Sequence, residues 1–157
     1  MRMLLVGLFG FLLTSCAQTR TANVEPLSFA SDLLPSLDGR TVAVLLVDTR
    51  GGARGEDPSE SIFESLQRAN PTAHWIRVQS GADADLVIKI SVFESTFSLG
   101  NWTGTVEFNV EQPRLGNNRF PVQRSVTLSN LWGYKSADDA LRQAYKQAMS
   151  ELIAKLS

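Results

Sequence analysis

Reactive sulfur and imidazole groups are almost absent from this sequence. Its only cysteine is Cys16 and its only histidine is His74. One cysteine cannot form a disulfide within the chain, and one histidine cannot build a zinc site with other histidines. The sequence also lacks blocks of like charge, low-complexity tracts and internal repeats.

The N-terminus has the pattern of an export signal. Arg2 precedes an apolar stretch over residues 3–13, and the small residues Thr14 and Ser15 follow. A positive charge, an apolar core and small residues are typical of a signal peptide. The apolar stretch has about 11 residues, whereas a membrane-spanning helix needs about 20. We therefore expect residues 1–15 to be a signal peptide rather than a retained membrane helix.

Residues 13–16, Leu-Thr-Ser-Cys, resemble the bacterial lipobox. This resemblance implies that Cys16 is acylated at its thiol and becomes the mature N-terminus; the alternative is an ordinary signal peptide that contains a cysteine. Several acyl chains would hold firmly, because each buried methylene adds about 0.8 kcal/mol. In enterobacterial lipoproteins, aspartate after the cysteine retains the protein at the inner membrane. Since Ala17 stands there, the resemblance implies the outer membrane, with the domain facing the periplasm.

Removal of residues 1–15 leaves about 140 residues, which corresponds to one domain. That length buries a core without metal or disulfides. The mature chain has 14 basic and 16 acidic residues. We expect no nucleic-acid partner, because nucleic acid requires a concentrated basic surface. Residues 16–26 are polar and are expected to form the lipidated N-terminus and a flexible tether, and residues 27–157 a single domain.

Hydrophobic periodicity predicts a mixed sheet and two helices. Residues 41–47 suit a strand buried on both faces. A helix follows, capped by Asp57 and stopped at Asn70-Pro71. Residues 74–79 form a short strand with Ile76 and Val78 on one face, and the strand-helix-strand unit implies a parallel pair.

The second half predicts three strands and a long helix. Residues 86–93 form an apolar strand with Val92 on the face of Leu86, Ile88 and Ile90. Residues 102–111 and 120–128 alternate and form an antiparallel hairpin. Ser136 and Asp139 begin a helix of about 20 residues.

The predicted fold is therefore an α+β two-layer sandwich in the order β-α-β-β-β-β-α. It has a mixed, mostly antiparallel sheet of about five strands, with both helices on one face. The apolar stripe of the long C-terminal helix needs such a sheet face to cover it. Its buried residues are expected to be Leu141, Tyr145, Ala148, Leu152 and Leu156.

No set of residues points to catalysis. His74 could act as the base for a serine nucleophile, but the sequence has no nucleophile-elbow motif. A surface position is therefore the better interpretation of His74. Asp48, Asp83 and Asp85 could do acid–base work, but they lie where Asp bonds to turn backbone. The Gly-rich residues 51–55 lie between a strand and a helix but lack the Walker spacing for phosphate. We therefore expect a non-enzyme with no catalytic residue, cofactor or metal.

The aromatic residues offer a different kind of site. Trp102 and Phe108 share an apolar strand face and are expected in the core. Trp132 and Tyr134 lie in a segment with no strand or helix pattern, Asn130-Leu131-Trp132-Gly133-Tyr134. Aromatic side chains in an exposed loop anchor binding partners. Trp132 and Tyr134 are therefore the candidate partner contacts.

The domain resembles the YajG family of small bacterial envelope lipoproteins in residues 38–51, 84–88, 102–106 and 148–152. The resemblance runs from about residue 37 to the C-terminus and is carried by structural residues. The family implies no functional residues to transfer. The order of elements is also similar to that of the envelope lipoproteins LptE, LpoB and CsgG.

The sequence thus predicts an outer-membrane lipoprotein anchored through Cys16. Its periplasmic domain is expected to be a non-catalytic binding or assembly-accessory module with a protein partner in the envelope. The alternative is a plug or pore subunit of a lipid, polysaccharide or secretion export assembly.

Overall fold

The computed structural model describes residues 18–20, 24–29, 33–51 and 55–157. The predicted element order is confirmed, with one short strand and one 3-10 turn added before it. The elements are β1 (Gln18–Arg20), η1 (Pro35–Leu37), β2 (Thr41–Asp48), α1 (Ser59–Ala69), β3 (His74–Arg77), β4 (Leu86–Ser98), β5 (Asn101–Gln112), β6 (Asn118–Ser129) and α2 (Ala137–Leu156).

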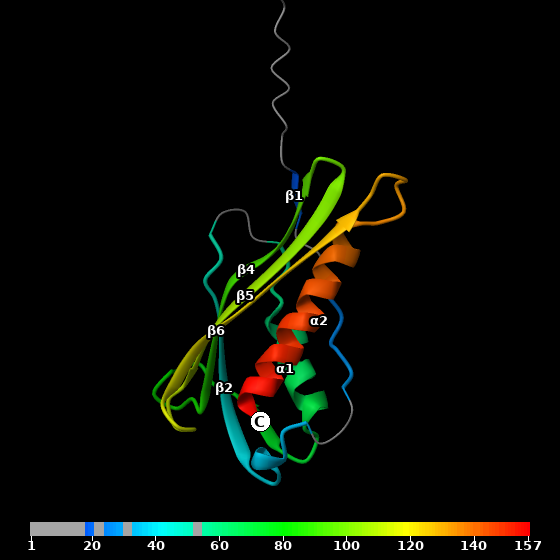
Figure 1. Cartoon of the computed structure of the whole chain (residues 1–157). Coiled ribbons are helices and arrows are strands. Elements are labelled where there is room, and N and C mark those ends of the chain that lie inside the picture. The colour runs from blue at the N-terminus through cyan, green and yellow to red at the C-terminus, as the bar shows by residue number, and fades with distance from the viewer. Residues whose placement is uncertain (1–17, 21–23, 30–32, 52–54) are drawn as a thin grey trace, which may run out of the picture.

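The strands form one mixed sheet in the order β3-β2-β4-β5-β6, and β1 pairs with β4 beside this path. The β2–β3 and β2–β4 pairs are parallel, while β4–β5, β5–β6 and β1–β4 are antiparallel. Figure 1 shows α1 and α2 together on one side of the sheet. The predicted two-layer α+β fold is therefore correct.

The core lies between the two helices and the inner face of the sheet, and α2 packs on β5. The predicted helix stripe is confirmed, because its five residues are between 0% and 9% exposed: Leu141, Tyr145, Ala148, Leu152 and Leu156. The predicted strand face is confirmed as well, and it consists of Trp102, Gly104, Val106, Phe108 and Val110. These residues recur at the periods of a helix and a strand, so each set forms one continuous apolar face.

Strand β4 is longer than predicted, and its buried face contains different side chains after Ile90. The register with β5 shifts between Ile90 and Val92, and β4 continues to Ser98. One extra residue reverses the alternation, as in a β-bulge. Phe93 is therefore buried at 1% exposure, and Val92 does not continue the face of Ile90 as predicted.

Strand β3 buries the residue that precedes the two singled out by the pattern, Ile76 and Val78. Trp75 is 6% exposed, whereas Ile76 is 38% exposed. The Trp75 indole N–H donates to the carbonyl of Asn70 at 2.9 Å, just after α1 ends. The face shared by Ile76 and Val78 is therefore the outer face of this edge strand.

The segment before β2 is more ordered than a plain tether. Gln18–Arg20, within the expected tether, forms β1, and Val24 is 2% exposed. The N–H of Leu27 donates to Ser65 Oγ at 2.9 Å, which ties this segment to α1. Backbone pairing and burial of one valine hold these polar residues against the domain.

The predicted start of α2 is confirmed at the level of hydrogen bonds, whereas α1 begins one residue later than predicted. Pro58 is the N-cap of α1 and has no side-chain capping bond, although the N–H of Ser59 donates to Asp57 Oδ1 at 2.9 Å. At α2, Ser136 Oγ accepts from the N–H of Asp139, and the Asp139 carboxylate accepts from the N–H of Ser136. This reciprocal pair is a capping box, which fixes the first turn of α2.

Candidate functional site

The candidate contact residues Trp132 and Tyr134 lie in the loop between β6 and α2. They are 84% and 85% exposed. The loop is nevertheless held in place, because Asn130 O accepts from the N–H of Gly133 at 3.0 Å and Asn130 Oδ1 from that of Lys135 at 2.9 Å. The two rings are therefore presented to solvent from a defined loop.

A second apolar side chain lies on the neighbouring β4–β5 turn. This turn has only two residues, Leu99 and Gly100, with φ of 49° and 77°. Two positive φ values define a type I′ turn, which favours Asn-Gly. A leucine in this conformation is strained, and its side chain is 88% exposed. Leu99 thus combines unfavourable backbone geometry with an unfavourable solvent environment.

The two loops meet and form one surface. The N–H of Asn130 donates to the carbonyl of Gly100 at 2.8 Å. A Cβ placed on Gly100 would lie 3.5 Å from a methyl carbon of Leu131, which is itself 77% exposed. Leu99, Leu131, Trp132 and Tyr134 are named here the apolar tip. Among the described residues, only one further large apolar side chain, Ile76, is exposed.

The apolar tip stands on a small apolar cluster of its own. Trp102 is 9% exposed, as expected for a core residue, and its ring lies 4.9 Å from that of Phe97, between centroids. Ala137 and Ala140 at the start of α2 complete the cluster, and Ser95 Oγ donates to the carbonyl of Ala137 at 2.7 Å. This packing holds both tip loops to the domain.

Strand β1 lies at the same end of the molecule as the apolar tip (Figure 1). Gln18 pairs with Phe97, two residues before Leu99. Cys16, the predicted lipidation site, lies outside the described residues.

The candidate acids carry structural hydrogen bonds. Asp48 binds Arg50 through both carboxylate oxygens, at 2.9 Å to Nε and 2.8 Å to Nη2. Arg50 is 6% exposed, and the hydrogen bonds that it donates to the Asp48 carboxylate raise the pKa of its guanidinium. This pair fixes the end of β2.

Asp85 departs from the turn interpretation. Its Oδ2 accepts from the N–H of Ala43 at 2.8 Å, so this carboxylate bonds to the distant strand β2 rather than to nearby turn backbone. The backbone of Asp83 closes the turn onto Ser80, and His74 is exposed at the start of β3. Residues 52–54 of the Gly-rich loop lie outside the described residues. Within the described ranges, no three His, Cys, Asp or Glu residues come together as a metal site.

No helix in the described part of the chain is both long and apolar enough to cross a membrane.

No family model and no curated protein matches the chain. Several solved bacterial structures are similar to it. A hypothetical protein from Chlamydia trachomatis has 12% identity and a TM-score of 0.41 over 76% of this chain and 96% of that one. A protein from Xanthomonas campestris, described by the family model DUF330, has 14% identity and a TM-score of 0.41 over 85% and 91%. PelC from Paraburkholderia phytofirmans, described as a dodecamer, has 14% identity and a TM-score of 0.46 over 86% and 97%.

These similarities are too low to carry an argument about function. None of the three is described as a YajG protein, so that resemblance stays a prediction. The fold and the tip together define a small α+β domain with an exposed apolar end.

Proposed function

We propose that this protein is an outer-membrane lipoprotein, anchored through Cys16, whose periplasmic domain is a non-catalytic binding module of the envelope. The apolar tip is its contact surface for a protein that lies in or on the same membrane. The observation that carries the proposal is the apolar tip itself, with four side chains between 77% and 88% exposed.

The composition of the tip favours a binding role. Contiguous exposed apolar side chains are rare on isolated domains and mark interaction sites. Tryptophan and tyrosine are enriched among the residues that dominate binding energy. The strained Leu99 adds to this, since asparagine or glycine would suit the turn and the solvent better.

The position of the tip supports a partner at the membrane. Two aromatic rings bury about 300–500 Å² together, which is less than the about 800 Å² that each protein contributes to a standard complex. Anchoring both proteins in one membrane raises their effective concentration and compensates for a small contact. Gln18, which follows the proposed anchor by two residues in the sequence, pairs with Phe97 near this end of the sheet.

The test is photocrosslinking in intact cells that express the full chain. A photoreactive phenylalanine analogue replaces Trp132 in one variant and Gln123, which is exposed on β6, in the control. We expect a crosslinked product of one defined mass at position 132 only. Leu131→Ser should weaken it, because Leu131 belongs to the same surface.

Other outcomes overturn the proposal in distinct ways. Adducts with lipid alone would show that the tip rests on the bilayer rather than on a protein. Adducts between copies of this chain would favour the alternative predicted from sequence, a subunit of an export assembly. Equal products at positions 132 and 123 would show that the tip has no special role.

A further inference from the structure

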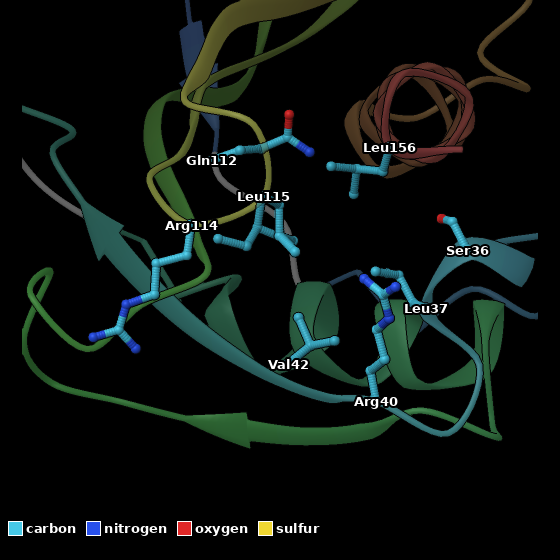
Figure 2. A pocket seen from close by; sticks show the side chains of 9 residues that line it. Ser36, Leu37, Arg40, Val42, Gln112, Arg114, Leu115 and Leu156 are labelled. Carbon is cyan, nitrogen blue, oxygen red and sulfur yellow. The ribbon is translucent and has the colours of Figure 1, made fainter.

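A pocket, shown in Figure 2, lies beside Leu156 at the end of α2, whereas the apolar tip lies beside the start of this helix. Its walls come from the last turn of α2, the start of β2, the end of β5 and the chain after it. The cavity has a volume of about 350 Å³. Small-molecule sites span about 300–1,000 Å³, so this pocket suits a small ligand. Its lining residues include Leu37, Arg40, Val42, Gln112, Leu115 and Leu156.

Five of the nine described lining residues are aliphatic: Leu37, Val42, Leu86, Leu115 and Leu156. Val42 and Leu86 are each 1% exposed, and Leu37 and Leu156 are 6% and 9% exposed. Burial of a ligand's methylene groups against these side chains is favourable by about 0.8 kcal/mol each. None of the described lining residues is aromatic, so the wall that they form fits a flexible alkyl chain better than a stacked ring.

Gln112 brings a neutral polar group to this wall. It is 7% exposed, and Figure 2 shows its carboxamide extending toward Leu156. No hydrogen bond joins this carboxamide to another described residue, so Gln112 offers both a donor and an acceptor to a molecule in the pocket.

Arg40 brings a positive charge. Figure 2 shows its guanidinium entering the pocket beside Leu37, whereas that of Arg114 points away. Arg114 donates to the carbonyls of Ala82 and Asp83 at 2.7 and 3.2 Å. Arg40 forms no side-chain hydrogen bond or ion pair with any described residue. A guanidinium presents two parallel donors that match carboxylate and phosphate oxygens.

We propose that this pocket binds an anionic amphiphile, a short alkyl or acyl chain with a carboxylate or phosphate head. The head pairs with Arg40 at the mouth. The chain lies among Leu37, Val42 and Leu156. Gln112 forms a hydrogen bond with a polar atom of the ligand. A free fatty acid and a single-chain phospholipid fragment share this chemistry.

Photolabelling of the full chain in phospholipid vesicles tests the proposal. The probes are three medium-chain alkyl diazirines that differ only in their head group, which is a carboxylate, a phosphate or an ammonium. We expect the anionic probes to label the peptides that contain Leu115 and Leu156, and the ammonium probe to leave them unlabelled. Preference between the two anions distinguishes a fatty acid from a phospholipid fragment.

Arg40→Gln should reduce the labelling about tenfold, as expected for the loss of a charge-assisted hydrogen bond. Arg114→Gln is the matched control, because it removes the same charge from the same rim and should leave labelling unchanged. Gln112→Leu should weaken labelling by the carboxylate and phosphate probes, and the ammonium probe should still give no labelling. Equal labelling by all three probes, or labelling insensitive to Arg40→Gln, would overturn the proposal.

Discussion

Gly104 of β5 lies directly against the backbone of Ala140 in α2. A Cβ on Gly104 would be 2.4 Å from both the carbonyl carbon and the oxygen of Ala140. No side chain fits at that separation, so glycine sets how closely the helix approaches the sheet. This contact lies beneath the apolar tip and determines where α2 begins relative to β5.

Gly104→Ala should therefore destabilise the domain, by about 1–3 kcal/mol or more, as overpacking does. Urea unfolding monitored by circular dichroism measures the loss. Gly51→Ala is the control, because a Cβ there meets nothing within 4 Å. A Gly104→Ala variant as stable as Gly51→Ala would contradict the close packing of α2 on β5.

Asp48→Asn should destabilise strongly, because it leaves the buried Arg50 guanidinium without its bidentate partner. The two side chains are 7% and 14% exposed, and breaking a buried pair costs about 3–5 kcal/mol. The control is Glu64→Gln, whose partner Arg68 lies 3.2 Å away in an exposed pair. Exposed pairs contribute about 0–1 kcal/mol. Equal unfolding midpoints for the two variants would contradict the structural role of Asp48.

The capping box makes the stability of α2 depend on pH in the acid range. The hydrogen bonds from the backbone and side chain of Ser136 lower the pKa of Asp139. A lowered folded-state pKa means that the carboxylate stabilises the fold above the ordinary Asp pKa of about 3.9, and that this contribution is lost as the pH falls through the folded-state pKa. Asp139→Asn should reduce stability at neutral pH and flatten this acid-side decline. Urea midpoints measured from neutral to acid pH would show both effects, and an unchanged slope would contradict them.

Leu99→Asn should stabilise the domain while weakening the crosslink at position 132. Asparagine tolerates positive φ, whereas the left-handed conformation costs an ordinary residue about 1–2 kcal/mol. We expect a gain of about 1 kcal/mol in urea unfolding and a weaker crosslinked product. A stabilised variant with an undiminished crosslink would show that Leu99 is not part of the contact surface.

Cys16→Ser should release the full chain from the membrane fraction, because the thiol that would carry the acyl chain is removed. Mass spectrometry of the wild-type mature chain should find Cys16 at its N-terminus with acyl groups attached. The variant Ser15→Ala, which keeps a small residue before the cysteine, is the control and should stay in the membrane. An unmodified Cys16 would contradict the anchor.

Hydrophobic periodicity correctly predicted the helices and strands whose buried face is apolar without interruption. The alternation from Trp102 to Val110 and the stripe from Leu141 to Leu156 each repeat without interruption, so burial could be predicted residue by residue. The capping box was equally visible, because Ser136 and Asp139 stand at the required spacing. These features depend on residues close together in the sequence.

The features that were missed depend on contacts between distant segments. The bulge near Ser91 has no residue type that marks it, yet it decides whether Val92 or Phe93 is buried. Strand β4 continues through polar Ser95 because that hydroxyl donates to the carbonyl of Ala137 in α2. Periodicity cannot detect a polar residue that is buried by such a distant partner.

The candidate site was predicted in part. Trp132 and Tyr134 stood out because they lie outside any strand or helix pattern. Leu99 did not, because Leu-Gly lacks the asparagine or aspartate that marks a two-residue turn. Arg40 and Gln112 are far apart in the sequence, and only the fold places both on the wall of one pocket.

The length of α2 separates the two ends of the domain. Its 20 residues extend for about 30 Å, from the base of the apolar tip to Leu156 in the pocket wall. A rigid rod of that size acts as a spacer. With the tip against a partner at the membrane, a ligand at Arg40 would lie at the far end of this spacer, and it would have to leave the bilayer completely before this protein could hold it.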